Sequence, residues 1–272
     1  MCLDGWIQKF DKDSTTVWMK EVPGNTVKML KVHTTFENVE PHVLYAMFED
    51  GSYRHVWDEA MLSDDVICKI EEGNSDIVYY AMKCPAPLRN RDFVAQRCWK
   101  KNSNDEYIVF NHSVAHEQYP PSRQFIRGLS FVTGYIIRKS ENGGSFFSYL
   151  THSDPRGMVP KWLLNIVASK ISPRIVLKMA KAAEDYLDWK AQNTTLTDSK
   201  DPSLDNVPVV SISNLKEMSE EEVPLTPIKG EPDYLGGEAM LVDSEVAPNN
   251  LPIIDSMLMM NDSTEDKEDV LK

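Results

Sequence analysis

An arginine and an aspartate stand four residues apart in the chain, at Arg54 and Asp58. On a helix this spacing places both side chains on one face, where they can form an ion pair. An exposed pair of this kind contributes only ~0.3–0.5 kcal/mol and has no bearing on function. The pair lies among Tyr53, Val56 and Trp57, however, and Tyr and Trp are mostly buried by area. Two interpretations therefore stay open at this point: a surface ion pair, or a charge held inside an apolar interior.

The other reactive side chains form no recognisable catalytic or metal-binding pattern. His112 and His116 fall on a predicted strand, where four residues span roughly 13 Å, too far to bind one metal ion together. The chain has no Gly-x-Ser-x-Gly motif, no phosphate-binding glycine loop and no Cys-x-x-Cys motif. Residues 151–154, Thr-His-Ser-Asp, hold the residue types of a triad too close together in sequence. We therefore expect no enzyme activity, no metal and no cofactor.

Composition divides the 272-residue chain into two unequal parts. Residues 193–272 carry 18 of the 42 acidic residues but only 5 of the 29 Lys and Arg residues, so the formal net charge of −13 belongs to this segment. All Trp and Phe residues precede it, and Tyr234 is its one aromatic residue. Such a segment cannot bury enough apolar surface to offset the entropy of ordering it. We predict one domain over residues 1–192 and an acidic disordered tail over residues 193–272.

The sequence also indicates where the protein works. It begins without the charged and apolar regions of a secretory signal, and no apolar run approaches the ~20 residues that a membrane span needs. Its cysteines show no metal-ligand spacing and are expected to be free thiols. A neutral domain with an acidic tail argues against a nucleic-acid partner, which requires a basic excess. We expect a soluble cytoplasmic protein.

The domain is predicted to be rich in antiparallel strands. Two β-rich runs, residues 15–22 and 27–36, flank a Pro-Gly-Asn turn and indicate a hairpin. Helical spacing follows over residues 40–50, with Pro41 near the first turn. Five more strand candidates are joined by short turns, which implies an antiparallel sheet. Their sequences are DIVYYAMKC, RDFVAQRCW, EYIVFNHSV, QFIRGLSFVTGYIIR and SFFSYLTHS.

The last predicted element of the domain is an amphipathic helix over residues 160–189, kinked at Pro173. Its apolar residues recur every three to four positions, at Leu163, Val167, Ile171, Ile175, Met179, Ala183 and Tyr186. Its polar side carries a row that we call the basic stripe, made of Lys170, Arg174, Lys178 and Lys181. The basic stripe is either a solvated face or a face that meets an anionic membrane surface.

Three motifs in order along the chain resemble the START domain, the StAR-related lipid-transfer fold. The stretch YRHVWD resembles its Tyr-Arg-x-x-Trp-Asp element, CPAPLRNRDFV its Pro-x-Pro-x-x-Asn-Arg-Asp strand, and DPRGMVPKWLLN the Gly-x-x-Pro-x-Trp entry to its last helix. The stretches NHSVAHEQYPP and TGYII are similar to the phosphatidylcholine-transfer-protein subgroup. Over about residues 1–192 the resemblance implies an α+β helix-grip fold, a curved antiparallel sheet wrapped on a long C-terminal helix and enclosing a lipid tunnel. Members of the family usually have a further helix before the strand that here starts near Trp6, so we expect either a shortened form or another segment that covers this surface.

The resemblance assigns a role to the Arg54–Asp58 pair. Arg54 falls on the family's cavity arginine, which binds the ligand phosphate, and Asp58 on the acidic partner of that arginine. A planar guanidinium can bind phosphate oxygens through two donors, and a buried charge without a partner is very costly. The alternative is a buried pair that only stabilises the fold. Residues 90–92, Asn-Arg-Asp, are expected to be structural rather than ligand contacts.

The resemblance also implies an aromatic cage that holds a choline headgroup by cation–π attraction. The matching positions, with the residues beside them, are Tyr80, Met82, Phe93, Phe131 and Thr133. This cage has no Trp, the best ring for a cation, so an ethanolamine headgroup remains as open as choline. The alternative is that these aromatic residues on strands only fill the core.

From these features we expect a non-enzymatic protein that binds a glycerophospholipid, phosphatidylcholine and/or phosphatidylethanolamine, and transfers it between membranes during transient surface contact. The alternatives are a lipid sensor that regulates a protein partner, a sterol-binding START protein and an acyl-thioester hydrolase. In the tail, Ser219, Thr226 and Ser263 stand in phosphorylation patterns. Phosphate there would add negative charge, and we hypothesise that the tail then competes with anionic lipid for the basic stripe.

Overall fold

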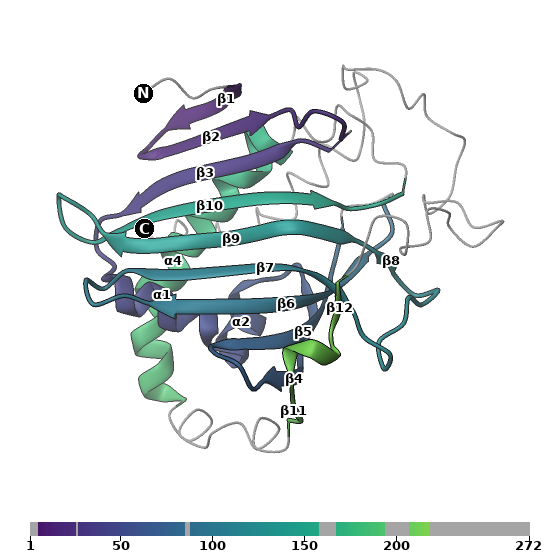
Figure 1. The fold of residues 1–272 in the computed structure, drawn as a ribbon. Coiled ribbons are helices and arrows are strands. Elements are labelled where there is room, and N and C mark those ends of the chain that lie inside the picture. Colours follow the sequence, from purple (N-terminus) through teal and green to yellow (C-terminus); the bar gives the residue numbers. More distant parts are fainter. Residues whose placement is uncertain (1–4, 26, 85–87, 158–166, 194–206, 218–272) are drawn as a thin grey trace, which may run out of the picture.

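The computed structural model describes residues 5–25, 27–84, 88–157, 167–193 and 207–217 (Figure 1). The helical elements of these ranges are α1 (Pro41–Glu49), α2 (Gly51–Trp57), a π-helical turn η1 (Val167–Ile171), α4 (Ser172–Gln192) and a 3₁₀ turn η2 (Ile212–Asn214). The strands are β1 (Trp6–Lys12), β2 (Thr15–Lys20), β3 (Met29–Phe36), β4 (Met61–Ile70), β5 (Ser75–Met82), β6 (Arg91–Lys101), β7 (Tyr107–Ala115), β8 (Ile126–Arg127), β9 (Leu129–Lys139), β10 (Ser145–Asp154), β11 (Val209–Val210) and β12 (Lys216–Glu217).

One large curved sheet forms the body of the domain, in the order β1-β2-β3-β10-β9-β7-β6-β5-β4-β11. Its long strands pair antiparallel, and the parallel contacts are those of β11 with β4 and of β8 with β6. The predicted hairpin and the five later strand candidates are confirmed as β2–β3 and as β5, β6, β7, β9 and β10. The sequence did not suggest β4, because two irregularities in its pairing with β5 interrupt the alternation of apolar and polar residues.

Local sequence explains the two short helices. Pro41 stands in the first turn of α1, where its missing N–H costs nothing. Asp50 then ends α1 and caps α2, since its Oδ1 accepts a hydrogen bond from the backbone N–H of Tyr53 at 3.1 Å. The hydroxyl of Tyr53 donates to the carbonyl of Ala182 at 2.8 Å, which ties α2 to the C-terminal helix. These contacts hold the helix that carries Arg54.

The C-terminal helix differs from the prediction at its start. Pro173 does not kink a continuous α-helix but lies in the first turn of α4, directly after the π-helical turn η1. A proline is tolerated there because it has no N–H to contribute. Ile175 is also not a core residue: it is 46% exposed, and Val176 is buried in its place. Residues 160–166 of the predicted helix, including Leu163, lie outside the described residues.

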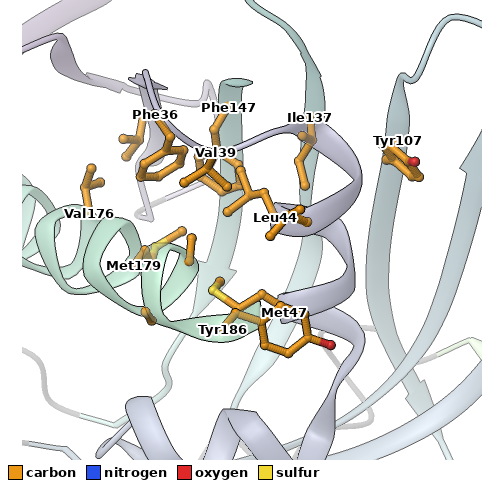
Figure 2. Close-up of a cluster of buried hydrophobic side chains, with 14 of the residues drawn as sticks. Phe36, Val39, Leu44, Met47, Tyr107, Ile137, Phe147, Val176, Met179 and Tyr186 are labelled. Carbon is orange, nitrogen blue, oxygen red and sulfur yellow. The ribbon is translucent and has the colours of Figure 1, made fainter. Parts of the chain in front are cut away.

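The main core lies between the sheet and the helices α1 and α4, which cover one face of it (Figures 1 and 2). Figure 2 shows side chains of α4 facing Leu44 and Met47 of α1 and Phe147 of β10. The α4 residues of this core are Val176, Met179, Ala182, Ala183 and Tyr186. Burial of this face at about 25 cal/mol per Å² of apolar surface is what holds α4 on the sheet. The fold is therefore α+β, with the sheet gripping the C-terminal helix, as predicted.

Part of the segment predicted to be a disordered tail packs on the domain. Residues 207–217, which we call the strap, cross the face of the sheet opposite to α4 and carry β11, η2 and β12 (Figure 1). Val210 and Leu215 of the strap pack against a second cluster of buried residues from β4, β5, β6 and β7. The tail prediction is therefore wrong for the strap, because a few apolar residues find a partner surface that composition alone does not reveal.

Candidate functional site

Arg54 and Asp58 form the ion pair that their spacing predicts, and the pair is half-buried. The guanidinium donates from Nε and Nη2 to Asp58 Oδ2 at 3.3 and 3.2 Å. Asp58 is held in turn, because its Oδ1 accepts from the backbone N–H of Ala60 at 3.2 Å. The two side chains are 33% and 21% exposed. Within the described residues, these bonds leave Nη1 of Arg54 able to meet another acceptor.

A second donor stands beside this pair. The guanidinium of Arg54 lies 5.8 Å from the centre of the Trp57 ring. The indole Nε1 of Trp57 is buried and has no hydrogen-bond partner among the described residues. A buried donor without an acceptor costs about 1–3 kcal/mol. The Trp57 side chain is thus a second group near Arg54 with an unmet hydrogen-bond donor.

Arg54 faces the interior between sheet and helices rather than solvent alone. The pKa values of Tyr80, Tyr135 and Tyr149 are all raised, first of all by burial, and the positive charge of Arg54 opposes the rise in each. The same holds for the carboxyl of Glu49, whose pKa burial also raises. These four side chains come from β5, β9, β10 and α1, yet all lie within electrostatic range of one guanidinium. The sequence pointed to Tyr80 alone among them.

The predicted headgroup cage is only partly assembled. Tyr80 and Phe93 are neighbours on β5 and β6, with their rings stacked at 5.0 Å. Phe131 lies at a bulge in β9, where its ring contacts His152 at 4.5 Å, and the structure shows no ring contact between Phe131 and the other two. Met82 ends β5 and is 36% exposed. The structure thus brings together two of the three predicted rings.

Thr133, the remaining cage residue, belongs to a cluster of hydroxyl groups on β9 and β10. Its Oγ1 lies 2.7 Å from that of Thr151 and 3.0 Å from the Oγ of both Ser153 and Ser130. Ser153 and Thr151 also lie within 2.9 Å of each other. Hydroxyl groups that both donate and accept satisfy one another in this way. The cluster adds a polar strip to an otherwise aromatic interior.

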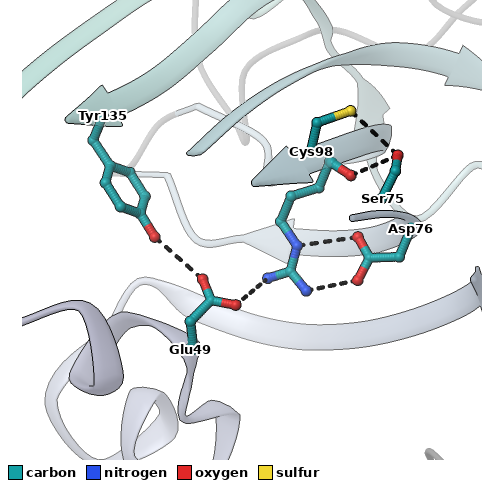
Figure 3. Close-up of polar contacts among 6 residues, drawn as sticks. Glu49, Ser75, Asp76, Cys98 and Tyr135 are labelled. Carbon is teal, nitrogen blue, oxygen red and sulfur yellow. Dashed lines mark hydrogen bonds and ion pairs between the residues drawn. The ribbon is translucent and has the colours of Figure 1, made fainter. Parts of the chain in front are cut away.

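A network of charged residues that the sequence did not reveal joins α1 to the sheet (Figure 3). Arg97 of β6 donates to both oxygens of Asp76 on β5, at 3.1 and 2.8 Å. Its Nη1 lies 3.8 Å from Glu49 Oε2, and the hydroxyl of Tyr135 donates to Glu49 Oε1 at 3.3 Å. The sequence did hold one signal for this pair, because Asp76 and Arg97 are charged residues within two strongly apolar strands. That the two residues pair, however, depends on the register of β5 and β6.

The residues 90–92 have the structural roles expected of them. Asp92 forms a buried bidentate ion pair with Arg127 at 2.9 Å for both bonds. Arg91 is 1% exposed and donates to the backbone carbonyls of Pro155 and Arg156 at 3.2 Å. The Oδ1 of Asn90 accepts from the backbone N–H of Cys84 at 3.0 Å. These contacts tie strands and loops of the domain together.

The basic stripe lies on and just before α4, apart from the interior. Lys170 and Lys181 are exposed, while Arg174 and Lys178 are partly buried. Lys178 pairs with Glu59 at 3.2 Å and Lys181 with Asp185 at 3.5 Å. Ile175, on the same part of the helix, is among the exposed apolar residues. Exposed basic side chains and an exposed apolar side chain thus lie close together at the N-terminal half of α4.

Other predicted features can be placed only in part. Ser219, Thr226 and Ser263 lie outside the described residues. Within the described part of the chain, no group of three or more His, Cys, Asp or Glu side chains is arranged to hold a metal ion. None of the described helices is long and apolar enough to span a membrane.

Comparison with known proteins finds a family and several relatives. The START domain model matches residues 3–187. START domain-containing protein 10 of Mus musculus is 33% identical over 190 residues, which cover 70% of this chain and 65% of that protein, so the chain spans slightly less than two thirds of that relative. Phosphatidylcholine transfer protein of Mus musculus is 28% identical over 162 residues, covering 57% of this chain and 73% of that protein.

Solved structures agree with this grouping. The crystal structure of human STARD10 superimposes with a TM-score of 0.70 at 30% identity, covering 79% of this chain and 88% of that one. Human StAR-related lipid transfer protein 5 shares the fold with a TM-score of 0.62 at 17% identity, covering 68% and 88%. With the family model matching most of a domain in which a curved sheet grips a C-terminal helix, the chain belongs to the START domain family.

Proposed function

We propose that this protein binds one glycerophospholipid, phosphatidylcholine and/or phosphatidylethanolamine, between its sheet and α4, and transfers it between membranes without chemical change. The observation that carries the proposal is the placement of Arg54. Its guanidinium is bound by Asp58 and stays partly accessible. Its positive charge also opposes the rise in the pKa values of tyrosines on β5, β9 and β10. A relative named for phosphatidylcholine transfer supports the ligand class.

The physical terms of binding follow from the ligand. Removing acyl chains from water contributes ~0.8 kcal/mol per CH₂ group. This term is not selective among lipids, so selectivity must come from the polar end. A phosphodiester would share the guanidinium of Arg54 with Asp58 through charge-assisted hydrogen bonds, and the unpartnered Nε1 of Trp57 lies beside it. Arg54 would then neutralise the negative charge of the phosphate, which is costly to bury without a partner.

The proposal includes transient membrane contact by a cytoplasmic protein. The basic stripe and the exposed Ile175 give the start of α4 the character of an interfacial helix face. Phosphate on Ser219, Thr226 or Ser263 would make the acidic tail a stronger competitor for this face. Phosphomimetic substitution of these three residues is expected to weaken binding to anionic vesicles, and unchanged binding would refute the role of the tail.

The decisive experiment identifies what the purified protein carries. We expect native mass spectrometry of the full chain to show one glycerophospholipid per molecule, and Arg54→Ala to reduce its occupancy roughly tenfold or more, the value of a hydrogen bond to a charged group. Lys9→Ala on the exposed strand β1 removes a positive charge elsewhere and serves as the control.

This experiment and two further assays of the purified protein separate the alternatives. A sterol retained in Arg54→Ala would contradict the phosphate-binding role, because a sterol has no phosphate. Phospholipid binding without transfer between vesicles would favour a lipid sensor over a carrier. Hydrolysis of an acyl-CoA by the purified protein would favour the thioesterase alternative.

A further inference from the structure

Glu49 ends α1 and turns its carboxylate toward Tyr135 of the sheet (Figure 3). The positive charge of Arg54 also acts on this carboxylate and opposes the rise in its pKa. Its side chain is 27% exposed. Both of its contacts are long: the Tyr135 hydroxyl donates at 3.3 Å, and Arg97 Nη1 lies 3.8 Å away. Among the described residues, no other cation lies within ion-pair distance of it. The carboxylate is therefore only loosely compensated.

The charges around Glu49 do not balance. Arg97 is already engaged by Asp76 through two shorter bonds, at 2.8 and 3.1 Å. Arg54 is likewise engaged by Asp58, whose Oδ2 accepts from both Nε and Nη2. Two guanidinium groups thus face three carboxylates, and Glu49 is the one without a close partner. Burial raises the pKa of Glu49, which agrees with an anion that the surrounding protein does not fully stabilise.

A cation from the ligand would complete this arrangement. Glu49 lies within electrostatic range of Arg54, the residue proposed to bind the lipid phosphate. In a zwitterionic phospholipid the ammonium group follows the phosphate after two methylene groups, so one headgroup supplies an oppositely charged partner for each of the two residues. We propose that Glu49 is the headgroup-specificity determinant of this protein and that it selects a lipid with a primary ammonium group, as in phosphatidylethanolamine. This inference rests on the proposed function and names its preferred ligand.

Hydrogen bonding decides between the two kinds of ammonium. A primary ammonium has three N–H donors, as the side chain of lysine does, and can donate to the Glu49 carboxylate and to the oxygen of Tyr135. A quaternary ammonium has no N–H and depends on aromatic faces. The aromatic cage is incomplete here, because Tyr80 and Phe93 stack on each other and Phe131 contacts His152. The interior therefore offers more to a hydrogen-bonding cation than to a trimethylated one.

The test uses the full chain and Glu49→Gln, which keeps the side-chain volume and removes the charge. Each protein is incubated with vesicles of equal phosphatidylcholine and phosphatidylethanolamine content, re-isolated, and its bound lipid is quantified by mass spectrometry. We expect wild type to be enriched in phosphatidylethanolamine. Glu49→Gln should lower the ratio of phosphatidylethanolamine to phosphatidylcholine roughly tenfold or more, the effect of losing one charge-assisted hydrogen bond. Total lipid per protein should be retained, since Arg54 is intact.

Controls separate this role from effects on folding. Glu141→Gln changes an exposed carboxylate in the turn before β10 and should leave the ratio unchanged. Arg97 keeps its bidentate bond to Asp76 in Glu49→Gln, so the fold should persist, which thermal unfolding can check. An unchanged lipid ratio in Glu49→Gln, or a wild type enriched in phosphatidylcholine, would overturn the proposal. A wild type that binds no glycerophospholipid would instead overturn the proposed function itself.

Discussion

Two arginine–aspartate pairs in this domain differ in burial and therefore in what they can do. In the Arg127–Asp92 pair the side chains are 4% and 2% exposed, so no ligand can reach them. In the Arg54–Asp58 pair they are 33% and 21% exposed. Removing one partner of a fully buried pair leaves an unpaired buried charge and typically costs about 3–5 kcal/mol of unfolding free energy. In a partly exposed pair, a ligand can take the place of one partner. Accessibility, rather than the residue types, distinguishes a structural pair from a binding one.

The raised pKa of Glu49 predicts a pH dependence that one substitution can isolate. Because burial raises this pKa, the folded, lipid-free protein keeps a proton on Glu49 at pH values where the unfolded chain has lost it. The native state then binds more protons than the unfolded state, so the unfolding free energy falls as pH rises from the ordinary carboxyl value of 4.5 to the raised one. Glu49→Gln should remove this part of the slope.

Urea unfolding of lipid-free protein at a series of pH values measures this slope. Glu141→Gln should keep the wild-type slope, because its carboxylate is exposed. If wild type and Glu49→Gln showed the same pH dependence, the carboxylate would be fully compensated in the fold, and the loose contacts described above would have no energetic meaning.

Among the elements, α4 has two sides that differ in what they contact. One side packs on the main core through Val176, Met179 and Tyr186. The other side changes character along the helix, since basic residues dominate its first half and Glu184, Asp185 and Asp188 its second half. Only the first half can therefore meet an anionic surface without repulsion.

This asymmetry predicts which lysines contribute to membrane docking. Lys170→Ala combined with Lys181→Ala should weaken binding to anionic vesicles by roughly an order of magnitude, since each basic residue near such a surface contributes ~1 kcal/mol. Added salt should reduce the difference. The matched control is Lys9→Ala with Lys12→Ala on the exposed strand β1, which removes the same charge. Equal loss in both double variants, measured by co-sedimentation, would show that net charge and not α4 drives docking.

At the scale of the whole molecule, the sheet carries an apolar cluster on each face. The main core lies under α1 and α4, and the second cluster, with Ile67, Ile77 and Val94, is covered by the strap. The strap is fastened by β11 pairing with β4 and by Glu72, which accepts from the Ser211 hydroxyl at 2.6 Å and from the backbone N–H of Ile212 at 2.9 Å. It also pairs with the end of the β4 edge, at Lys69 and Ile70, where backbone groups would otherwise be open to another chain.

Truncation tests the contribution of the strap. A chain ending at residue 206 should lose about 1–3 kcal/mol of unfolding free energy, because Val210 and Leu215 no longer cover the second cluster. It should also associate more readily through the freed edge. A chain ending at residue 217 keeps the strap and should behave like the full chain in urea unfolding and size-exclusion chromatography. If the two truncated chains were equally stable, the strap would contribute nothing to the domain.

Much of the fold could be predicted from the sequence alone, because turns, helix starts and strands depend on neighbouring residues. The Pro-Gly-Asn turn and the β-rich runs joined by short turns predicted most of the sheet, and Pro41 marked the start of α1. Three spaced motifs indicated the START family. The four-residue spacing of Arg54 and Asp58 predicted their ion pair, since both residues belong to one short helical segment.

Contacts between residues far apart in the sequence could not be predicted and became known from the folded structure. The contact of Glu49 with Arg97 and Tyr135 depends on how α1 lies over β6 and β9, and the Arg97–Asp76 pair on the register of β5 and β6. A bulge in β9 sends Phe131 to His152 instead of the other predicted cage residues. The strap folds because a separate apolar surface receives it. Each of these interactions joins residues far apart in the sequence. It can stabilise the protein only after the sheet has brought those residues together.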